Sequence, residues 1–262
     1  MQSITRRLIG VVTVVCALSG GVTAAAFADN YVALGDSYSS GTGTRDYSLN
    51  SGCQRGPYAY PALIKADRPG TNLTFVACSG AKTGDVLANQ VQSLSTTTNI
   101  VTITIGGNDA GFSTVITKCA EPWPVNCDGD ITNAQNYINN SLPGALNAVY
   151  SQIKSRAPSA RVVVLGYPRL FMNVDCNLGT FFSSAEMTRL NTTADIMKNV
   201  ISARAAAYGF TFKDPIPAFV GHAVCSSTEW LNGLSNPVGD SYHPNRTGHK
   251  SGYEPLVRSV IG

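Results

Sequence analysis

The sequence predicts an α/β domain in which helices cover both faces of a parallel sheet. Five apolar runs are continuous rather than alternating, as in strands that are buried on both faces. Helix candidates separate these runs, and this alternation is typical of parallel sheets. About 234 residues remain once an N-terminal leader is set aside, enough for one domain to bury a full core. We therefore expect a doubly wound, three-layer sandwich with five parallel strands.

The expected strands are short, β-rich runs bounded by turn residues. They lie at Asn30–Asp36, Leu73–Cys78, Ile100–Ile105, Arg161–Gly166 and Phe210–Phe212. Ligands of such sheets bind beyond the carboxyl ends of the strands, so functional residues are expected there.

The expected helices alternate with the strands. They lie at about Tyr58–Ala66, Gly84–Leu94, Tyr137–Ser155, Ser184–Tyr208 and Thr247–Val260. Ser183 or Ser184 is a suitable N-cap for the long helix, and Gly209 is a suitable stop. Gly111–Ile131 and Leu170–Phe182 do not fit the alternation, so both are expected to be ordered loops.

The N-terminus has the pattern of a secretory signal peptide. Arg6 and Arg7 precede the apolar run Leu8–Leu18, and Ala26-Phe27-Ala28 provides a small-residue cleavage site. The apolar run is shorter than the ~20 residues of a membrane span, although an uncleaved anchor is the alternative. We expect a signal peptide at residues 1–28, one domain at residues 29–262 and secretion of the mature protein.

Charge and cysteine content narrow the class further. The net charge of +3 is scattered, which argues against a nucleic-acid partner, and a monomer is expected. Six cysteines remain after the leader: Cys53, Cys78, Cys119, Cys127, Cys176 and Cys225. An even number in an oxidising compartment predicts three disulfides, with 15 connectivities open, among them pairing of neighbours along the chain. A zinc site is the alternative, but the sequence has no C-x-x-C, and His222, His243 and His249 lack ligand spacing.

Two residues at opposite ends of the chain suggest nucleophilic catalysis. Ser37 follows the first strand in Gly35-Asp36-Ser37, where its hydroxyl could attack a carbonyl. Serine needs a base for this, and His243 precedes the last helix. Asp240 is the carboxylate that could orient the imidazole, with a backbone carbonyl as the alternative.

Donors for an oxyanion follow the second and third strands. Gly80 would let a backbone N–H approach a ligand closely, and Asn108 offers a side-chain amide. Either residue could instead serve only a turn.

Together these four blocks resemble the SGNH (GDSL) hydrolase family. Gly35-Asp36-Ser37, Gly80, Gly107-Asn108-Asp109 and Asp240-Ser241-Tyr242-His243 match its blocks in order. The resemblance covers nearly the whole mature chain and is closest to the secreted lipases, phospholipases and esterases of Streptomyces and related actinomycetes. It implies a flavodoxin-like sheet and sequential disulfides.

The resemblance also implies a role for each matched residue. Ser37 would be the nucleophile, His243 the general base and then acid, and the oxyanion hole would combine the Ser37 and Gly80 N–H groups with the Asn108 side chain. Some similar members orient the histidine through a main-chain carbonyl, here that of Ser241, instead of an aspartate such as Asp240. The mechanism requires no metal and no organic cofactor.

The substrate is expected to be a lipid ester, mainly from the resemblance, and transient contact with a lipid interface would follow. Candidate pocket residues are Tyr38, Phe112, Phe171, Met172, Phe181, Phe182 and Trp230.

Three other functions are weighed against this one. A carbohydrate deacetylase or other small-acyl esterase is the closest alternative. A non-catalytic extracellular binding domain would not need the four blocks together. Nucleotide binding at Gly41-Thr42-Gly43 lacks a complete phosphate-binding motif.

Overall fold

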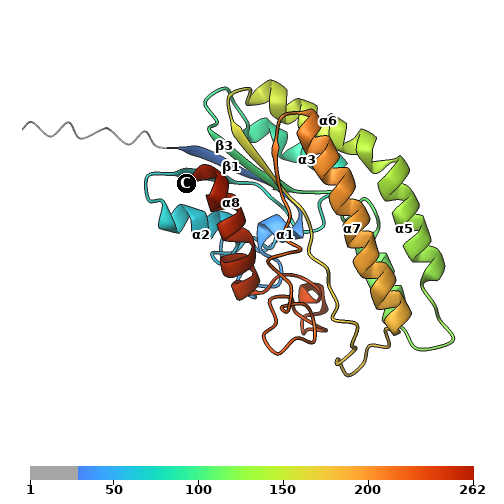
Figure 1. The fold of residues 1–262 in the computed structure, drawn as a ribbon. Coiled ribbons are helices and arrows are strands. Elements are labelled where there is room, and N and C mark those ends of the chain that lie inside the picture. The colour runs from blue at the N-terminus through green and yellow to red at the C-terminus, as the bar shows by residue number, and fades with distance from the viewer. Residues whose placement is uncertain (1–28) are drawn as a thin grey trace, which may run out of the picture.

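The computed structural model describes residues 29–262 (Figure 1), and the signal peptide expected at residues 1–28 lies outside them. One five-stranded parallel sheet forms the centre, in the order β2-β1-β3-β4-β5. The strands are β1 (Asn30–Gly35), β2 (Asn72–Phe75), β3 (Ile100–Thr104), β4 (Arg161–Leu165) and β5 (Thr211–Lys213). The predicted fold class and all five predicted strands are confirmed, with β2 ending earlier than expected.

Helices cover both faces of the sheet, as the continuous apolar strands predict. In Figure 1, α2 (Tyr60–Asp67) and α8 (Glu254–Ile261) lie on one side, and α3 (Thr83–Asn89), α6 (Leu142–Arg156) and α7 (Ser184–Ala207) lie on the other. Successive side chains of a strand point to opposite faces. Tyr31 and Ala33 of β1 accordingly enter the core under α2 and α8, whereas Val32 and Leu34 enter the core under α3, α6 and α7.

The helix predicted at Tyr137–Ser155 is wrong, because two helices occupy this region. Helix α5 (Asp128–Asn140) ends before Ser141, and α6 starts at Leu142 with Pro143 in its first turn. Proline has no N–H to continue a preceding helix but fits the first turn of a new one.

The loop predicted at Gly111–Ile131 is also wrong. It contains α4 (Phe112–Cys119) and the start of α5. Val115, Ile116 and Cys119 bury one face of α4 against the core. The proline-rich stretch that suggested a loop is confined to the short link between the two helices.

The end signals predicted for the long helix are confirmed for α7. The Ser183 side chain accepts a hydrogen bond from the Glu186 backbone N–H at 3.2 Å, and the Glu186 carboxylate accepts one from the Ser183 N–H at 2.8 Å. This reciprocal cap satisfies two N–H groups that the helix start leaves free. Gly209 follows the helix with φ +71°, a left-handed conformation that favours glycine.

Three disulfides join segments that follow the strands of the sheet. They join Cys53 to Cys78, Cys119 to Cys127, and Cys176 to Cys225. The last bridge links the loop after β4 to the segment after β5. The remaining short elements are α1 (Ser37–Ser40), 3₁₀ turns at Val91–Ser93 and Val238–Asp240, and a π-helix at Gly248–Tyr253 that runs into α8.

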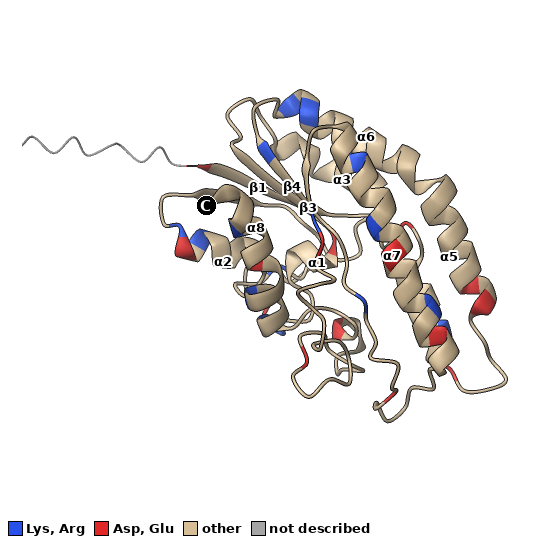
Figure 2. Ribbon diagram, in the orientation of Figure 1, with Lys and Arg blue, Asp and Glu red and all other residues tan. Residues whose placement is uncertain are grey.

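Charged residues of both signs are mixed over the helices (Figure 2). No helix within residues 29–262 combines the length and the apolar character needed to span a membrane.

Candidate active site

Ser37 is held at the carboxyl end of β1 by a single-turn helix. Asp36 caps α1, because its carboxylate accepts the Tyr38 N–H at 3.0 Å. The turn ends at Gly41, whose φ of +104° is left-handed. A cap and a glycine only five positions apart produce this element, which is too short for a hydrophobic pattern to predict. It places Ser37 at the first position of the turn, just beyond the carboxyl end of β1.

The fold brings Ser37 and His243 together across 206 positions of sequence. Their Oγ and Nε2 atoms lie 2.8 Å apart. On the other side of the ring, His243 Nδ1 lies 2.8 Å from the Ser241 carbonyl oxygen. A carbonyl can only accept, so Nδ1 carries the proton and Nε2 is free to accept the proton of Ser37.

The Asp240 carboxylate makes no hydrogen bond to the imidazole. Its carboxylate accepts a short hydrogen bond from the Tyr47 hydroxyl, and its other oxygen has no partner within residues 29–262. The Tyr47 hydroxyl in turn accepts the Gly43 N–H at 3.0 Å. Of the two orienting groups that the sequence allows, the Ser241 carbonyl is the one placed on His243.

Burial keeps His243 neutral. It lowers the pKa of His243 to about 4, and the Ser241 carbonyl and the charge of Asp240 oppose this shift only in part. A neutral imidazole with a free Nε2 is the form that acts as a base.

Sequence reasoning missed the residue that shapes the histidine loop. The Asn232 side-chain amide donates to the carbonyls of Gly43 at 3.0 Å and Asp240 at 3.2 Å. Its backbone N–H donates to the His243 carbonyl, and its carbonyl accepts from Tyr242 N–H. Asn232 therefore fixes both sides of the loop. No motif or spacing marks this position in the sequence.

Gly80 and Asn108 lie at the ends of the strands that flank β1. Gly80 has φ +80°, a conformation that orients its N–H and favours glycine. The Asn108 side-chain amide uses one hydrogen on the Ala81 carbonyl at 3.0 Å, which leaves the other for a ligand. This bond joins the loops after β2 and β3.

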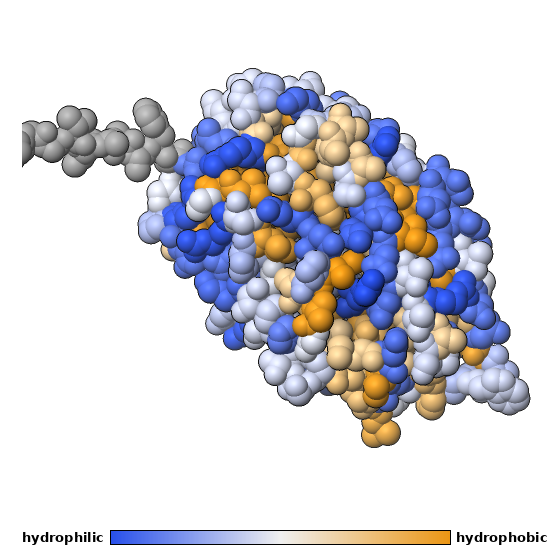
Figure 3. Space-filling model, in the orientation of Figure 1, coloured by the Kyte–Doolittle hydropathy of each residue, from blue (hydrophilic) through white to orange (hydrophobic). Residues whose placement is uncertain are grey.

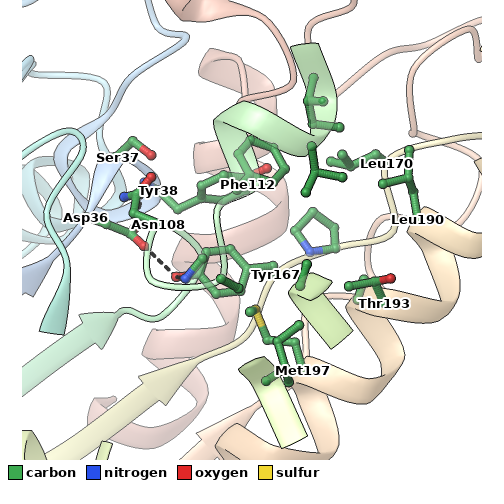
Figure 4. Close-up of a pocket in the computed structure, with 18 residues that line it drawn as sticks. Asp36, Ser37, Tyr38, Asn108, Phe112, Tyr167, Leu170, Leu190, Thr193 and Met197 are labelled. Carbon is green, nitrogen blue, oxygen red and sulfur yellow. Dashed lines mark hydrogen bonds between the residues drawn. The ribbon is translucent and has the colours of Figure 1, made fainter. Parts of the chain in front are cut away.

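An apolar pocket opens beside Ser37. Figure 4 shows Ser37, Asp36 and Asn108 at one end, and Leu190, Thr193 and Met197 of α7 toward the other. Its walls come from α4, α5, α7 and the segment after β4. The remaining lining residues are Tyr38, Gly107, Ala110, Phe112, Val115, Ile116, Ala134, Ile138, Tyr167, Pro168, Leu170 and Ala194.

Only two of the aromatic residues predicted for a pocket line it, Tyr38 and Phe112. Phe171 and Phe182 are buried and pack against Tyr242 behind the histidine loop. The other three lie elsewhere: Met172 and Phe181 are exposed, and Trp230 stacks on His222 at 3.8 Å. The walls from α5 and α7 were missed, because small and aliphatic residues there have the same pattern as an ordinary helix face.

Two side-chain clusters have the composition of a metal site, but the cysteines in each are joined by a disulfide. Within residues 29–262, Cys119 and Cys127 lie near Glu186, and Cys176 and Cys225 lie near Glu229. Each cysteine pair is bridged, so its sulfurs are not thiolate ligands.

Comparisons with known proteins identify relatives across this chain. The family model described as GDSL-like Lipase/Acylhydrolase matches residues 33–250. A lipase from Streptomyces rimosus is 46% identical over 235 residues, covering 89% of this chain and 87% of that protein.

Two solved structures are similar over the same region. One is an extracellular lipase from Streptomyces rimosus, with a TM-score of 0.83, 44% identity, and coverage of 89% of this chain and 100% of that chain. The other is phospholipase A1 from Streptomyces albidoflavus NA297, with a TM-score of 0.84, 44% identity, and coverage of 89% and 99%.

Proposed function

Because the chain belongs to the GDSL-like lipase/acylhydrolase family, we propose that it hydrolyses carboxylic esters of lipids, with Ser37 as nucleophile and His243 as base. The observation that carries this proposal is the 2.8 Å contact between Ser37 Oγ and His243 Nε2 at the end of an apolar pocket. The relatives that are named lipase and phospholipase A1 support the same substrate class.

Each half of the reaction uses the same two side chains. Ser37 Oγ attacks the ester carbonyl while His243 Nε2 takes its proton, and the imidazolium then protonates the leaving alcohol. An acyl-enzyme on Ser37 results. Water attacks it with His243 again as base, which releases the fatty acid and restores Ser37. The Ser241 carbonyl holds the ring in the reactive tautomer throughout.

Three donors would stabilise the oxyanion: the N–H groups of Ser37 and Gly80 and the side-chain amide of Asn108. Loss of one such donor typically costs ~10²–10³ in turnover. Since this chemistry uses proton transfer and hydrogen bonding alone, the proposed mechanism includes no metal and no organic cofactor.

The apolar pocket would hold the acyl chain. It runs from Ser37 between α5 and α7, and every side chain along those helices that lines it is uncharged. Burial of each methylene contributes ~0.8 kcal/mol, so a long chain gains more there than an acetyl group. The pocket favours lipid esters over the acetylated carbohydrates of the alternative hypothesis.

Exposed apolar side chains in two loops would contact a lipid surface. Figure 3 shows apolar residues at the lower tip of the molecule, over the loop between β4 and α7. Leu178 is fully exposed there, and Trp123 in the link between α4 and α5 is 90% exposed. Exposed apolar groups of this size commonly mark interaction sites.

We also propose that the protein is secreted as a single domain of residues 29–262 after removal of residues 1–28, and that it acts as a monomer. Three disulfides are typical of an oxidising compartment, and one relative is described as extracellular.

Two measurements test the proposed activity. A fluorophosphonate should label Ser37 of the active protein, and Ser37→Ala should abolish both labelling and ester turnover. Labelling of another serine with full turnover in that variant would disprove the assignment.

The acyl pocket has its own test. Ala194→Phe should fill the pocket and lower kcat/KM for long-chain esters at least tenfold, while acetyl esters are hydrolysed as before. Ala185→Phe, at an exposed position of the same helix, is the matched control and should change neither rate. Equal loss for acetyl and long-chain esters in Ala194→Phe would place the acyl chain elsewhere.

A further inference from the structure

Tyr167 connects two strand ends that carry the proposed catalytic groups. It follows Gly166 at the end of β4, and its half-buried ring packs edge-on against Tyr38 with centroids 5.1 Å apart. Its hydroxyl donates a short hydrogen bond to Asp36 Oδ2 (Figure 4, dashed line). The Tyr167 hydroxyl oxygen also accepts a hydrogen bond from the Gly107 N–H at 3.2 Å.

On one side, this bridge holds the residue that precedes Ser37. Asp36 is 1% exposed, and its carboxylate also accepts the Tyr38 N–H at 3.0 Å and the Thr104 hydroxyl at 2.7 Å. The Asp36 N–H donates to the Thr104 carbonyl. Three donors on one buried carboxylate leave Ser37 little freedom to move relative to β3.

On the other side, the bridge holds the residue that precedes Asn108. The Gly107 N–H lies beyond the end of β3, outside the sheet ladder, and the Tyr167 hydroxyl is its partner. A Cβ at Gly107 would lie 3.4 Å from the Tyr167 ring, so backbone and ring are in direct contact. Rotation of this peptide would move the Asn108 side chain with it.

We propose that Tyr167 is a positioning residue whose hydroxyl fixes the distance between Ser37 and Asn108, and thereby the geometry of the oxyanion hole. The proposal rests on the roles proposed above for these two residues. An oxyanion hole acts only when its donors lie about 2.7–3.1 Å from the oxyanion, so a shift of a few tenths of an ångström weakens it.

The bridge depends on the charge of Asp36. Burial raises the pKa of Asp36 to about 6, and the hydrogen bonds from Tyr167, Thr104 and Tyr38 oppose this rise. The other titratable groups around Asp36 are Asp109, whose charge raises the pKa further, and Tyr38, Tyr60 and Tyr253, whose own pKa values burial raises so that they are neutral. Protonation of Asp36 should therefore weaken the bridge and lower kcat below about pH 6. Tyr167→Phe has no bridge left to weaken, so this acid limb should be absent from its kcat profile.

Tyr167→Phe tests the proposal. With a soluble short-chain ester, we expect kcat to fall about 10- to 100-fold, a fraction of the loss from deleting a donor, while KM stays within about threefold because the ring still lines the pocket. Tyr208→Phe is the matched control. It also deletes one tyrosine hydrogen bond, to the Asn147 carbonyl at 3.0 Å, but far from Ser37, so it should keep the wild-type kcat.

A double mutant separates positioning from general stability. If Tyr167 acts through Asn108, the Tyr167→Phe change should cost little in an Asn108→Ala background, because the donor it positions is already gone. Full additivity of the two losses, or an unchanged kcat and acid limb in Tyr167→Phe, would overturn the proposal. Wild-type protein that neither reacts with a fluorophosphonate at Ser37 nor hydrolyses esters would instead overturn the proposed function itself.

Discussion

At the scale of single residues, the histidine loop separates two groups that the sequence places side by side. Asp240 and Ser241 both precede His243 closely, yet the Ser241 carbonyl is hydrogen-bonded to the ring and the Asp240 carboxylate is hydrogen-bonded to Tyr47. Residue types at a given spacing can identify a candidate carboxylate. They cannot predict which backbone oxygen a loop turns toward a side chain, because every residue has one.

Asp240→Asn should therefore leave most of the activity intact. We expect kcat to fall less than about tenfold, whereas loss of a triad aspartate costs ~10⁴. The measurement is kcat for a soluble ester, with thermal unfolding to confirm the fold. His243→Ala is the comparison and should lose activity by orders of magnitude. A loss in Asp240→Asn near the triad value would mean that the carboxylate, not the carbonyl, supports the base.

The four motif residues are predictable because their chemistry depends on residue type. Serine, imidazole and amide groups occur at strand ends in a recognisable order, and glycine marks the close backbone approach. Asn232 and Tyr167 have no such signature. Their roles depend on hydrogen bonds to backbone groups that are distant in sequence.

At the scale of elements, apolar runs predict the strands well because burial on both faces leaves little choice of composition. Helix α4 is missed because it has only two turns and lies among cysteines, prolines and glycine. In the sequence, only Pro143 marks the break between α5 and α6. Proline is compatible with the first turn of a helix as well as with a loop, so Pro143 alone does not predict where one helix ends and the next begins.

The disulfides Cys119–Cys127 and Cys176–Cys225 should differ in how much they stabilise the fold. Cys176–Cys225 spans 49 positions and Cys119–Cys127 spans eight. In the chain-entropy model, the disulfide that closes the longer loop adds more to the free energy of unfolding, about 4 kcal/mol against about 2.5 kcal/mol for the shorter loop. Replacing each pair by alanines and measuring urea unfolding should give this order. A larger loss from the shorter loop would show that native contacts, not chain entropy, dominate.

At the scale of the whole molecule, two buried groups give opposite responses to acid. Burial, with a smaller effect from His243, lowers the pKa of His249 to about 3, so the folded protein stays unprotonated there while the unfolded chain binds a proton below about pH 6.5. Stability from this group is thus lost as the pH falls. Asp36, with its raised pKa, binds a proton in the folded state first and offsets part of this loss between about pH 6 and pH 4.

His249→Asn isolates the histidine contribution. The Asn oxygen can still accept the Tyr60 N–H, which His249 Nδ1 accepts at 3.3 Å. The stability of the variant relative to wild type should rise by about 1.4 kcal/mol per pH unit as the pH falls below 6.5. Unfolding by urea at pH 7, 6, 5 and 4 measures this difference. A constant difference across the series would show that His249 has the same pKa in both states.

The contact between Ser37 and His243 also has a consequence for the order of events in folding. One partner emerges early in synthesis and the other only near the end of the chain, 206 positions later. Contacts of such sequence separation are slow to form, because a long loop must close before they contribute. Secondary structure should therefore recover before ester turnover when the unfolded protein is refolded. The onset of activity then reports that the fold is complete over both ends of the chain.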